Sequence, residues 1–293
     1  MTNPTPLLLP PTSLTSCPSH RPLLSHLQRL LNASYNTTHT LHPSLFGTNF
    51  VRLPSPSDIS ALPLPHGFTV LLVDVDPDTR EGTVVATGSV KDFGDVEPGA
   101  YVERSRESRA KEWGARERER EEVEDAGREG EDGRGEDDGE KEVGAIVLGS
   151  EAGAEQVKKF EITGFGVAVG EGKRGLGARV LALIEEVVER GWYGDWLEEK
   201  VGKGEFVVED VRIGGARVEG VDLRKLEGIG SNDGGKPGQV VKRPDVVLMC
   251  VRELGTEAYY AKRGYKSVAD GTISTGMWGC KKDCTWVYME KAA

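Results

Sequence analysis

The amino-acid sequence predicts an α/β fold, and three stretches of the chain support this prediction. Residues 160–169 form a short apolar run rich in Val, Ile and Phe, as in a buried strand, and a glycine cluster and an apolar helix pattern follow it. Two further strand patterns flank a turn at residues 76–82. Strand and helix patterns then alternate between residues 246 and 289. We therefore expect both strands and helices in the folded part of the chain.

The composition limits the class of protein. Hydrophobic residues make up 37% of the 293 residues, which is low for a fully globular chain, so we expect part of it to be disordered. The net charge is −11, and residues 103–142, with 17 acidic and 10 basic side chains, contribute −7 of it. A sequence pI near 5.1 argues against a general nucleic-acid binder.

Cysteine content and hydropathy indicate the compartment. The four cysteines are too few and too scattered for a disulfide framework, and they lack the companion Cys or His pair of a zinc site, so we expect no metal. No apolar run approaches the length of a membrane span, and we expect no membrane partner. These features favour a cytoplasmic or nuclear protein.

The N-terminal part of the chain begins with a segment rich in Pro, Ser and Thr. We expect residues 1–20 to be a flexible tail and residues 21–293 to form a single domain. Leucines on one face predict a helix over residues 23–35. His39 and His42 follow; either could relay a proton, although a loop histidine held by local hydrogen bonds is the simpler interpretation.

A hairpin and a charged segment come next. Residues 68–75 and 83–93 have strand composition, and the turn between them begins with Asp-Pro-Asp and ends with Gly82. Residues 98–143 form a low-complexity insertion, with too few apolar groups to offset the entropy of ordering. Two interpretations of this segment remain open: a loop insertion that the fold tolerates, and an interaction tail that contacts a protein partner. Residues 145–148 predict a brief strand.

The glycine-rich turn after residue 169 predicts an anion site. The first N–H groups of a helix have no intrahelical partner and lie at the positive end of its dipole, which suits phosphates. Gly170 to Gly175 match GxGxxG, but the strand and acidic residue that a dinucleotide site requires do not follow. The P-loop pattern fails, because Arg174 follows Gly172-Lys173 where Ser or Thr is required. Two interpretations of this turn remain: a loop that binds the pyrophosphate of a coenzyme, and a glycine-rich loop that only turns the chain.

The C-terminal part of the chain contains a second informative stretch. Residues 193–243 predict a partly ordered insertion, with a possible strand over 205–213 and a loop over 231–238. A strand over 246–251 leads into the helix pattern of Tyr259-Tyr260-Ala261-Lys262-Arg263, which stops at Gly264. Strands over 265–268 and 285–289 follow, with Met277-Trp278-Gly279 between them.

The strand, glycine turn and helix, the YYAKRGY segment and the closing residues 286–291 together resemble the GNAT superfamily of acyl-CoA-dependent N-acetyltransferases. The resemblance implies a mixed, mostly antiparallel central sheet of six to seven strands flanked by helices. It covers the part from residue 160 to the C-terminus well and residues 23–93 more loosely. Gly175 and Gly177 match the glycines of the family's loop, whereas Gly172 stands where Arg or Gln is usual.

The resemblance also implies how acetyl-CoA, the co-substrate, would bind. The backbone of Val167, Ala168 and Val169 would pair with the pantetheine arm like an added strand. The pyrophosphate would lie against the backbone N–H groups of the following turn and the start of its helix. That set comprises Gly172, Lys173, Arg174, Gly175, Leu176, Gly177 and Ala178. A solvated basic turn is the alternative for Lys173 and Arg174.

Two catalytic residues follow from the same resemblance. Glu161 lies 14 residues before Gly175, a spacing similar to that of the catalytic glutamate in histone-type members, and would be the base. A solvent-facing Glu161 with an ordered water as base is the alternative. Tyr260 lies four residues before Gly264, where the family often has a tyrosine near the cofactor sulfur. A phenol, with a pKa near 10, can protonate a thiolate, but Tyr260 could instead be core packing.

The expected function is therefore transfer of an acetyl group from acetyl-CoA to a primary amine by direct attack in a ternary complex. The alternative is a catalytically weak or inactive acyl-CoA-binding module that acts through protein interactions, because Gly172 replaces the usual Arg or Gln. The hypothesis of a nicotinamide-dependent oxidoreductase is supported by the GxGxxG match alone. The sequence leaves the acceptor amine and the oligomeric state open.

Overall fold

The computed structural model describes residues 3–15, 18–48, 50–64, 66–96, 146–147, 157–208, 211–229 and 243–292. The strands are β1 (Thr5–Leu9), β2 (Phe68–Val75), β3 (Gly82–Val96), β4 (Ile146–Val147), β5 (Val157–Val167), β6 (Arg212–Ile213), β7 (Ala216–Arg217), β8 (Val221–Asp222), β9 (Asp245–Val251), β10 (Lys266–Ile273) and β11 (Cys284–Ala292). The α-helices are α1 (Arg21–Leu41), α2 (Pro56–Ala61), α4 (Leu176–Arg190), α5 (Asp195–Gly202) and α6 (Thr256–Ala261). Short 3-10 helices are η1 (Pro11–Leu14), η2 (Leu223–Leu226), η3 (Arg252–Leu254) and η4 (Met277–Gly279).

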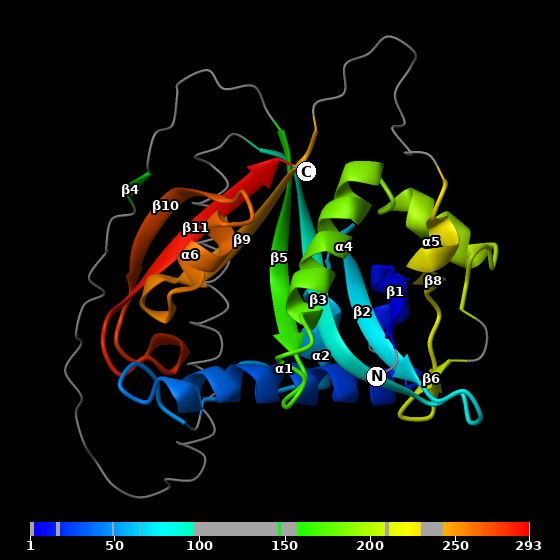
Figure 1. The fold of residues 1–293 in the computed structure, drawn as a ribbon, viewed down its shortest axis with the longest axis horizontal. Helices are drawn as coiled ribbons and strands as arrows, with labels where there is room; N and C mark the ends of the chain where they lie inside the picture. The colour runs from blue at the N-terminus through cyan, green and yellow to red at the C-terminus, as the bar shows by residue number, and fades with distance from the viewer. Residues whose placement is uncertain are drawn as a thin grey trace, which may run out of the picture.

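One large sheet organises this part of the chain. Nine of its strands are ordered β4-β10-β11-β9-β5-β3-β2-β1-β8, and β6 and β7 form a separate small hairpin. All neighbours in the large sheet are antiparallel except β5 and β9, which are parallel (Figure 1). The predicted mixed, mostly antiparallel sheet is thus confirmed. Its expected six to seven strands become nine, because the two-residue strands β4 and β8 extend its edges.

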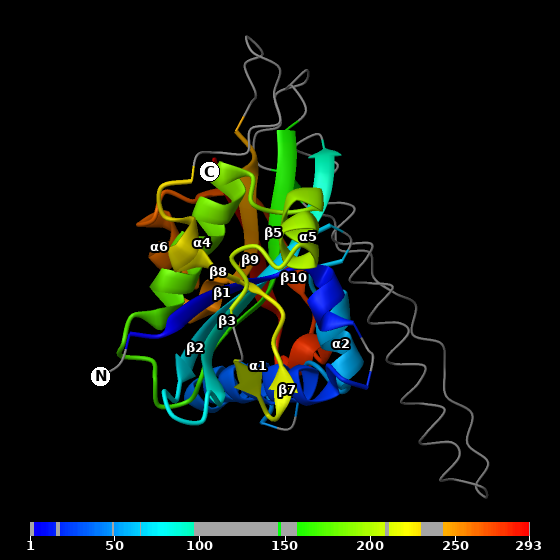
Figure 2. The ribbon, with the colours of Figure 1, turned by 90° about the vertical axis from the view of Figure 1, so that its right-hand side faces the viewer.

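Helices cover both faces of the sheet. Helix α4 packs on one face, where Val180, Ile184 and Val187 recur at helical spacing and are completely buried. Helix α1 lies across the opposite face, with its leucines against the apolar side chains of β2 and β3. Figure 2 shows α4 and α6 on one side of the sheet and α2 on the other. Strands β1, β2 and β3 therefore contribute to two cores, one on each face of the sheet.

Most predicted elements are confirmed with shifted ends. The helix pattern that follows the glycine cluster is confirmed as α4, and the φ of 68° at Gly191 allows this glycine to cap the last turn. Helix α1 extends beyond the predicted 23–35 at both ends. The hairpin of β2 and β3 forms, and the Asp76 carboxylate accepts the N–H groups of Asp78 and Thr79 in its turn, at 2.9 and 2.8 Å.

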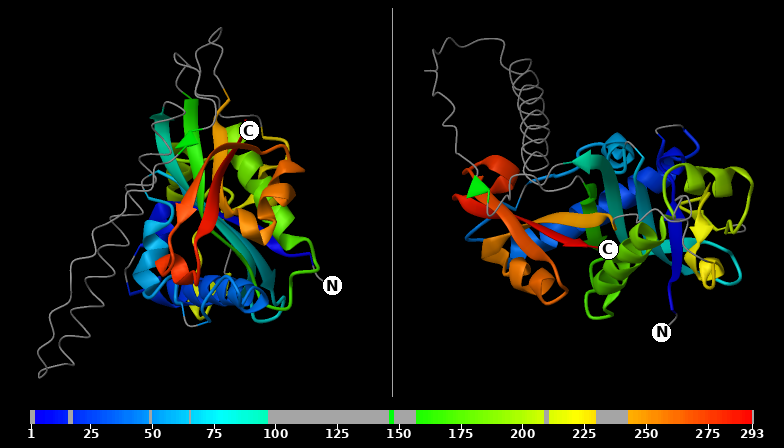
Figure 3. Two further views of the ribbon diagram at one scale, coloured as in Figure 1. Left: turned by 90° about the vertical axis from the view of Figure 1, so that its left-hand side faces the viewer. Right: turned by 90° about the horizontal axis from the view of Figure 1, so that it is seen from above.

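The prediction of a flexible tail over residues 1–20 is wrong for residues 5–9. These residues form β1, which pairs with β2 on one side and β8 on the other (Figure 3). Leu7 and Leu9 point into the core under α1, whereas Leu8 points into the core under α4, and all three are completely buried. The three leucines stabilise a strand because the two faces of this sheet are both apolar.

The remaining predicted segments are changed, confirmed or outside the described residues. Residues 205–213 do not form one strand; β6 covers only Arg212–Ile213, and Val207 makes an isolated bridge to Val221. The predicted strand at 145–148 is confirmed as Ile146–Val147. The charged insertion at 98–143, the loop at 231–238 and the possible protein partner of the insertion lie outside the described residues.

A leucine in β1 tests whether this strand belongs to the core. We expect Leu8→Ala to lower the free energy of unfolding by about 2–5 kcal/mol, because it leaves a cavity at a completely buried site. Leu41→Ala is the matched control, since Leu41 is 71% exposed and its replacement should change stability by less than about 0.5 kcal/mol. Urea denaturation measures both; equal midpoints for Leu8→Ala and wild type would contradict the strand.

Candidate functional site

The parallel strands β5 and β9 form a fork. Among the described residues they pair over 159–162 and 245–248, at the end of the sheet near the C-terminus. In the adjoining β3–β5 ladder, Ser89 and Val90 oppose the residues on either side of Thr163, so Thr163 is an extra residue in β5. A bulge of this kind bends its strand. It therefore turns β5 away from β9 at the point where their pairing ends, and Figure 1 shows the two strands separating toward α1.

An ion-pair cluster lies at the closed end of the fork. Lys159 of β5 is 2% exposed, and its Nζ contacts the carboxylates of Asp245 at 2.5 Å and Glu290 at 2.7 Å. Burial alone lowers the pKa of Lys159, but the hydrogen bonds that Lys159 donates to the two carboxylates outweigh burial and raise it. The lysine therefore remains charged and joins β5 to β9 and β11.

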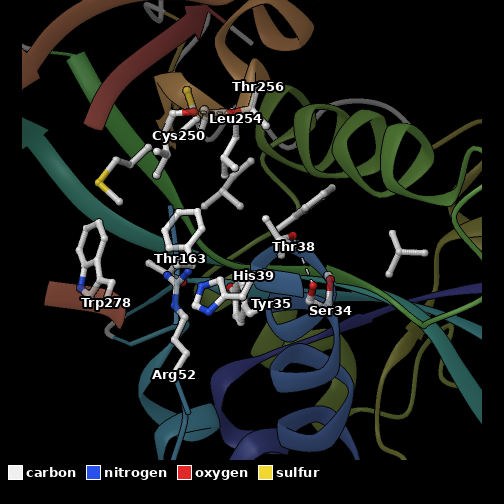
Figure 4. Close-up of a pocket in the computed structure, with 18 of the residues that line it drawn as sticks. Ser34, Tyr35, Thr38, His39, Arg52, Thr163, Cys250, Leu254, Thr256 and Trp278 are labelled. Carbon is white, nitrogen blue, oxygen red and sulfur yellow. Dashed lines mark hydrogen bonds between the residues drawn. The ribbon is translucent and has the colours of Figure 1, made fainter. Parts of the chain in front are cut away.

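A pocket of about 340 Å³ occupies the open end of the fork. Its walls include the facing edges of β5 and β9: Ile162, Thr163, Phe165, Gly166 and Val167 from β5, and Leu248, Met249, Cys250 and Val251 from β9. Helix α1 contributes Ser34, Tyr35, Thr38 and His39, and Figure 4 shows Cys250, Leu254 and Thr256 on the other side of the pocket. The volume is that of a small-molecule site.

The pocket passes between the two faces of the sheet. Leu181 of α4 and Tyr260 of α6 line it from one face, and both belong to or pack against the core under α4. Phe46 and Trp278 line it from the other face. A ligand in the pocket can therefore be contacted from both faces.

The backbone of β5 has one paired edge and one edge that faces the pocket. The N–H of Ala168 donates to the carbonyl oxygen of Val85 at 2.9 Å, so this amide serves the β3 ladder. Backbone groups of successive strand residues point to opposite edges. The amide of Val167 therefore points away from β3, and Val167 lines the pocket. Val169 lies in the turn after β5, outside the lining, and its side chain is 65% exposed.

The predicted anion turn lies beyond the end of β5, outside the pocket lining. Gly170 and Gly175 have φ of 91° and 70°, and no described atom lies within 4 Å of a Cβ built at Gly170, Gly172 or Gly175. No side chain among the described residues caps α4, whose first backbone bond joins the N–H of Arg179 to the oxygen of Gly175. The N–H groups of Leu176, Gly177 and Ala178 thus lack intrahelical partners.

The two basic side chains of the turn have different surroundings. Lys173 is exposed. Arg174 contacts the carboxylates of Asp74 at 3.0 Å and Glu171 at 2.8 Å, and these hydrogen bonds raise its pKa further. Its charge is therefore shared with two acids. The element after α4 is the helix α5, whereas a dinucleotide fingerprint requires a strand there.

Tyr260, which the resemblance names as the acid, lies in the pocket lining. Its ring packs edge-on against Tyr265, with centroids 5.8 Å apart, and borders the core under α4. Burial is the main cause that raises the pKa of its phenol. The hydroxyl therefore stays protonated at neutral pH and can act as a donor. Tyr259 is instead 38% exposed.

Glu161 does not line the pocket. It lies in the paired part of β5, opposite Lys91 of β3 and Val247 of β9, and is 2% exposed. Since Phe160 points into the core under α4, the neighbouring Glu161 points to the other face of the sheet. The alternative that it faces solvent is wrong. Glu161 is two residues from the pocket-lining Thr163.

His39 is the titratable residue that the sequence left undecided. It is 8% exposed, lines the pocket and stacks on Phe46 with ring centroids 4.5 Å apart. Its Nδ1 is 3.1 Å from the carbonyl oxygen of Gly47; because a carbonyl only accepts, Nδ1 carries the proton and Nε2 keeps its lone pair. Burial lowers the pKa of His39, and the charge of Arg52 lowers it further against the effect of the Gly47 bond. His42, by contrast, ends α1 outside the lining.

The described residues contain no group of three or more His, Cys, Asp or Glu side chains that could hold a metal ion. Cys250, Cys280 and Cys284 are free, buried thiols. None of the helices in the described ranges combines the length and the apolar character that crossing a bilayer requires.

Comparison with protein-family models and with curated proteins finds no match to this chain. The site must therefore be interpreted from its own geometry.

Proposed function

We propose that the protein is a GNAT-type N-acetyltransferase that transfers an acetyl group from acetyl-CoA to a primary amine. One observation carries the proposal: the pocket at the fork of β5 and β9 is lined by the partly buried Tyr260 and by Leu181 of α4, the helix whose start has no side-chain cap among the described residues. The parallel strand pair, the helix between its strands and the sheet that continues through β11 support the resemblance seen in the sequence.

The acyl donor would lie along the open edge of β5. The amide of Val167 would bond the pantetheine arm, since it lies on the edge not used by β3, and Val169 would follow it in the turn. The pyrophosphate would accept the N–H groups of residues 176–178, with Lys173 near its charge. Arg174 is a weaker candidate for a phosphate contact, because two carboxylates already bind it.

The reaction joins the acetyl carbon to the acceptor nitrogen. The amine lone pair attacks the thioester carbonyl, the N–C bond forms and the C–S bond breaks. One proton leaves the nitrogen, and one proton reaches the departing sulfur. Tyr260 lines the pocket with a hydroxyl that is protonated at neutral pH, and it would donate the proton to the departing thiolate.

His39 is a better candidate than Glu161 for the base that takes the amine proton. It lines the pocket with Nε2 unprotonated, and stacking on Phe46 fixes its ring. Glu161 lies outside the lining, in the paired part of the sheet. An imidazole of lowered pKa is neutral at pH 7 and able to accept a proton.

A substitution in the glycine turn tests the site of acetyl-CoA binding. Gly172→Glu should weaken the affinity for acetyl-CoA at least about tenfold, or about 1.4 kcal/mol, because a carboxylate would face the pyrophosphate. The turn has open space at this position, so the variant should fold. Calorimetric titration measures the affinity, with Gly202→Glu, at another open and exposed glycine, as the control. Equal affinities of Gly172→Glu and wild type would place the pyrophosphate elsewhere.

Removal of one hydroxyl tests the acid. Tyr260→Phe should lower kcat by on the order of 10²-fold while acetyl-CoA affinity stays within about threefold, because the ring and its packing remain. Tyr259→Phe, on the neighbouring exposed ring, should leave kcat unchanged. Thiol release under saturating substrates gives kcat. A Tyr260→Phe enzyme as fast as the Tyr259→Phe enzyme would remove the phenol from the mechanism.

The pH dependence tests the base. Protonation inactivates a base, so kcat/KM of the wild type should fall as the pH drops through the pKa of His39, which lies below 6.5. His39→Gln should lose this limb and about 10²–10⁴-fold of kcat/KM. His42→Gln serves as the control. Retention of the acidic limb in His39→Gln, with loss of it in Glu161→Gln, would reassign the base to Glu161.

The second candidate function is an acyl-CoA-binding module that does not catalyse transfer. Two observations favour it: Gly172 lacks the usual cationic or amide side chain, and Arg174 is bound by Asp74 and Glu171. Acetyl-CoA binding that is sensitive to Gly172→Glu, without thiol release for any amine, would select this alternative.

A further inference from the structure

The imidazole of His39 is held by the loop that follows α1 and by the loop of η4. Its ring stacks face to face on Phe46, with the ring centroids 4.5 Å apart and the ring planes 3° apart. Its Nδ1 donates to the carbonyl oxygen of Gly47 at 3.1 Å. A Cβ built at Gly279 would lie 3.6 Å from Cε1 of His39. None of these three contacts uses Nε2, so the nitrogen that would take the amine proton keeps its lone pair.

The Phe46 ring is itself fixed by its surroundings. Phe46 is 4% exposed, and its backbone forms an isolated bridge with Cys280. The N–H of the next residue, Gly47, donates to the carbonyl oxygen of Gly279 at 2.7 Å. Two segments that are far apart in the sequence therefore hold the face of this ring against His39.

A proton taken by His39 creates a positive charge that no lining carboxylate balances, since none of the described lining residues is Asp or Glu. Burial lowers the pKa of His39, and the positive charge of Arg52 lowers it further. The other titratable groups of the lining are Tyr35, Tyr260 and Cys250. Burial raises the pKa of Tyr260 and of Cys250, so both are neutral at pH 7. The imidazolium must therefore be stabilised by dipoles and rings.

We propose that Phe46 is a positioning residue of the acetyl transfer, whose ring face stabilises the imidazolium of His39. This inference rests on the proposed function. As the N–C bond forms, the proton of the amine nitrogen moves to Nε2, Nδ1 keeps its own proton on Gly47, and solvent later takes the Nε2 proton. The negative face of an aromatic ring attracts a cation within about 6 Å of its centroid. Phe46 thus gives His39 the stabilisation that an acidic partner gives a catalytic histidine elsewhere.

Phe46→Leu removes the ring face and keeps an apolar side chain. The pKa of His39 should fall by about 0.4–1.5 in this variant, the range that corresponds to the loss of one cation–π contact. A ring that only filled space would give the opposite sign, because its removal would let water reach the imidazole and raise the pKa. NMR titration of isotope-labelled histidines in the full chain measures this pKa, and His39→Gln identifies the His39 signal.

Phe165→Leu is the matched control, since Phe165 is a lining ring that packs against the core under α4. It should leave the pKa of His39 unchanged. Pentafluorophenylalanine at position 46 is a second variant, because it keeps the shape of the ring and reverses the charge of its face. It should lower the pKa of His39 at least as far as Phe46→Leu does, and it remains decisive if Phe46→Leu does not fold.

The rate of transfer connects this pKa to the reaction. The acidic limb of kcat/KM reports the pKa of the base in the free enzyme, so it should move to lower pH in Phe46→Leu by the same amount as the NMR titration. A pKa of His39 that stays unchanged or rises in either variant at position 46 would overturn the inference. A lowered pKa with an unmoved acidic limb would do so too, because His39 would then lie outside the reaction.

The proposed function fails by a different measurement. Calorimetry would then detect no acetyl-CoA binding, and no amine would release thiol. The NMR titration needs neither acetyl-CoA nor an acceptor, so the contact between Phe46 and the imidazolium is measured independently of the transfer.

Discussion

The site depends on the end of one hydrogen-bonded ladder. Strands β5 and β9 pair over four residues each and then separate, because Thr163 adds one residue to β5 at that point. Separation leaves backbone groups of β5 without a neighbouring strand and opens a space inside the sheet rather than on its surface. The pocket, the open strand edge and the approach to the start of α4 all follow from this single change of register.

A divergent pair of strands must be held together where it still pairs. Lys159 does this at the closed end, because its buried ammonium contacts carboxylates from β9 and β11. At the open end, α1 packs closely against β5, and a Cβ at Gly166 would lie 2.9 Å from Leu31. The fork is therefore closed by charge at one end and bridged by a helix at the other.

Local patterns predicted much of the fold. The β2–β3 hairpin, the strand before the glycine turn, helix α4 and the strands β9 and β11 each follow from periodicity and turn residues within one stretch. The strand β1 was missed because its prolines and short length hid three leucines that need both faces of a distant sheet. The bulge at Thr163 could not be predicted, since register depends on the partner strand.

The candidate site was predicted in part for the same reason. Tyr260 and Val167 line the pocket, and the glycine turn leaves the start of α4 accessible, as local motifs indicated. His39 lines the pocket and Glu161 does not, which the sequence could not show because burial and contact arise from packing. His39 meets Gly47 and Phe46 only after the loop that follows α1 folds back. Because residues from both faces of the sheet line the pocket, a change in the packing of either face would alter the shape of the space between β5 and β9.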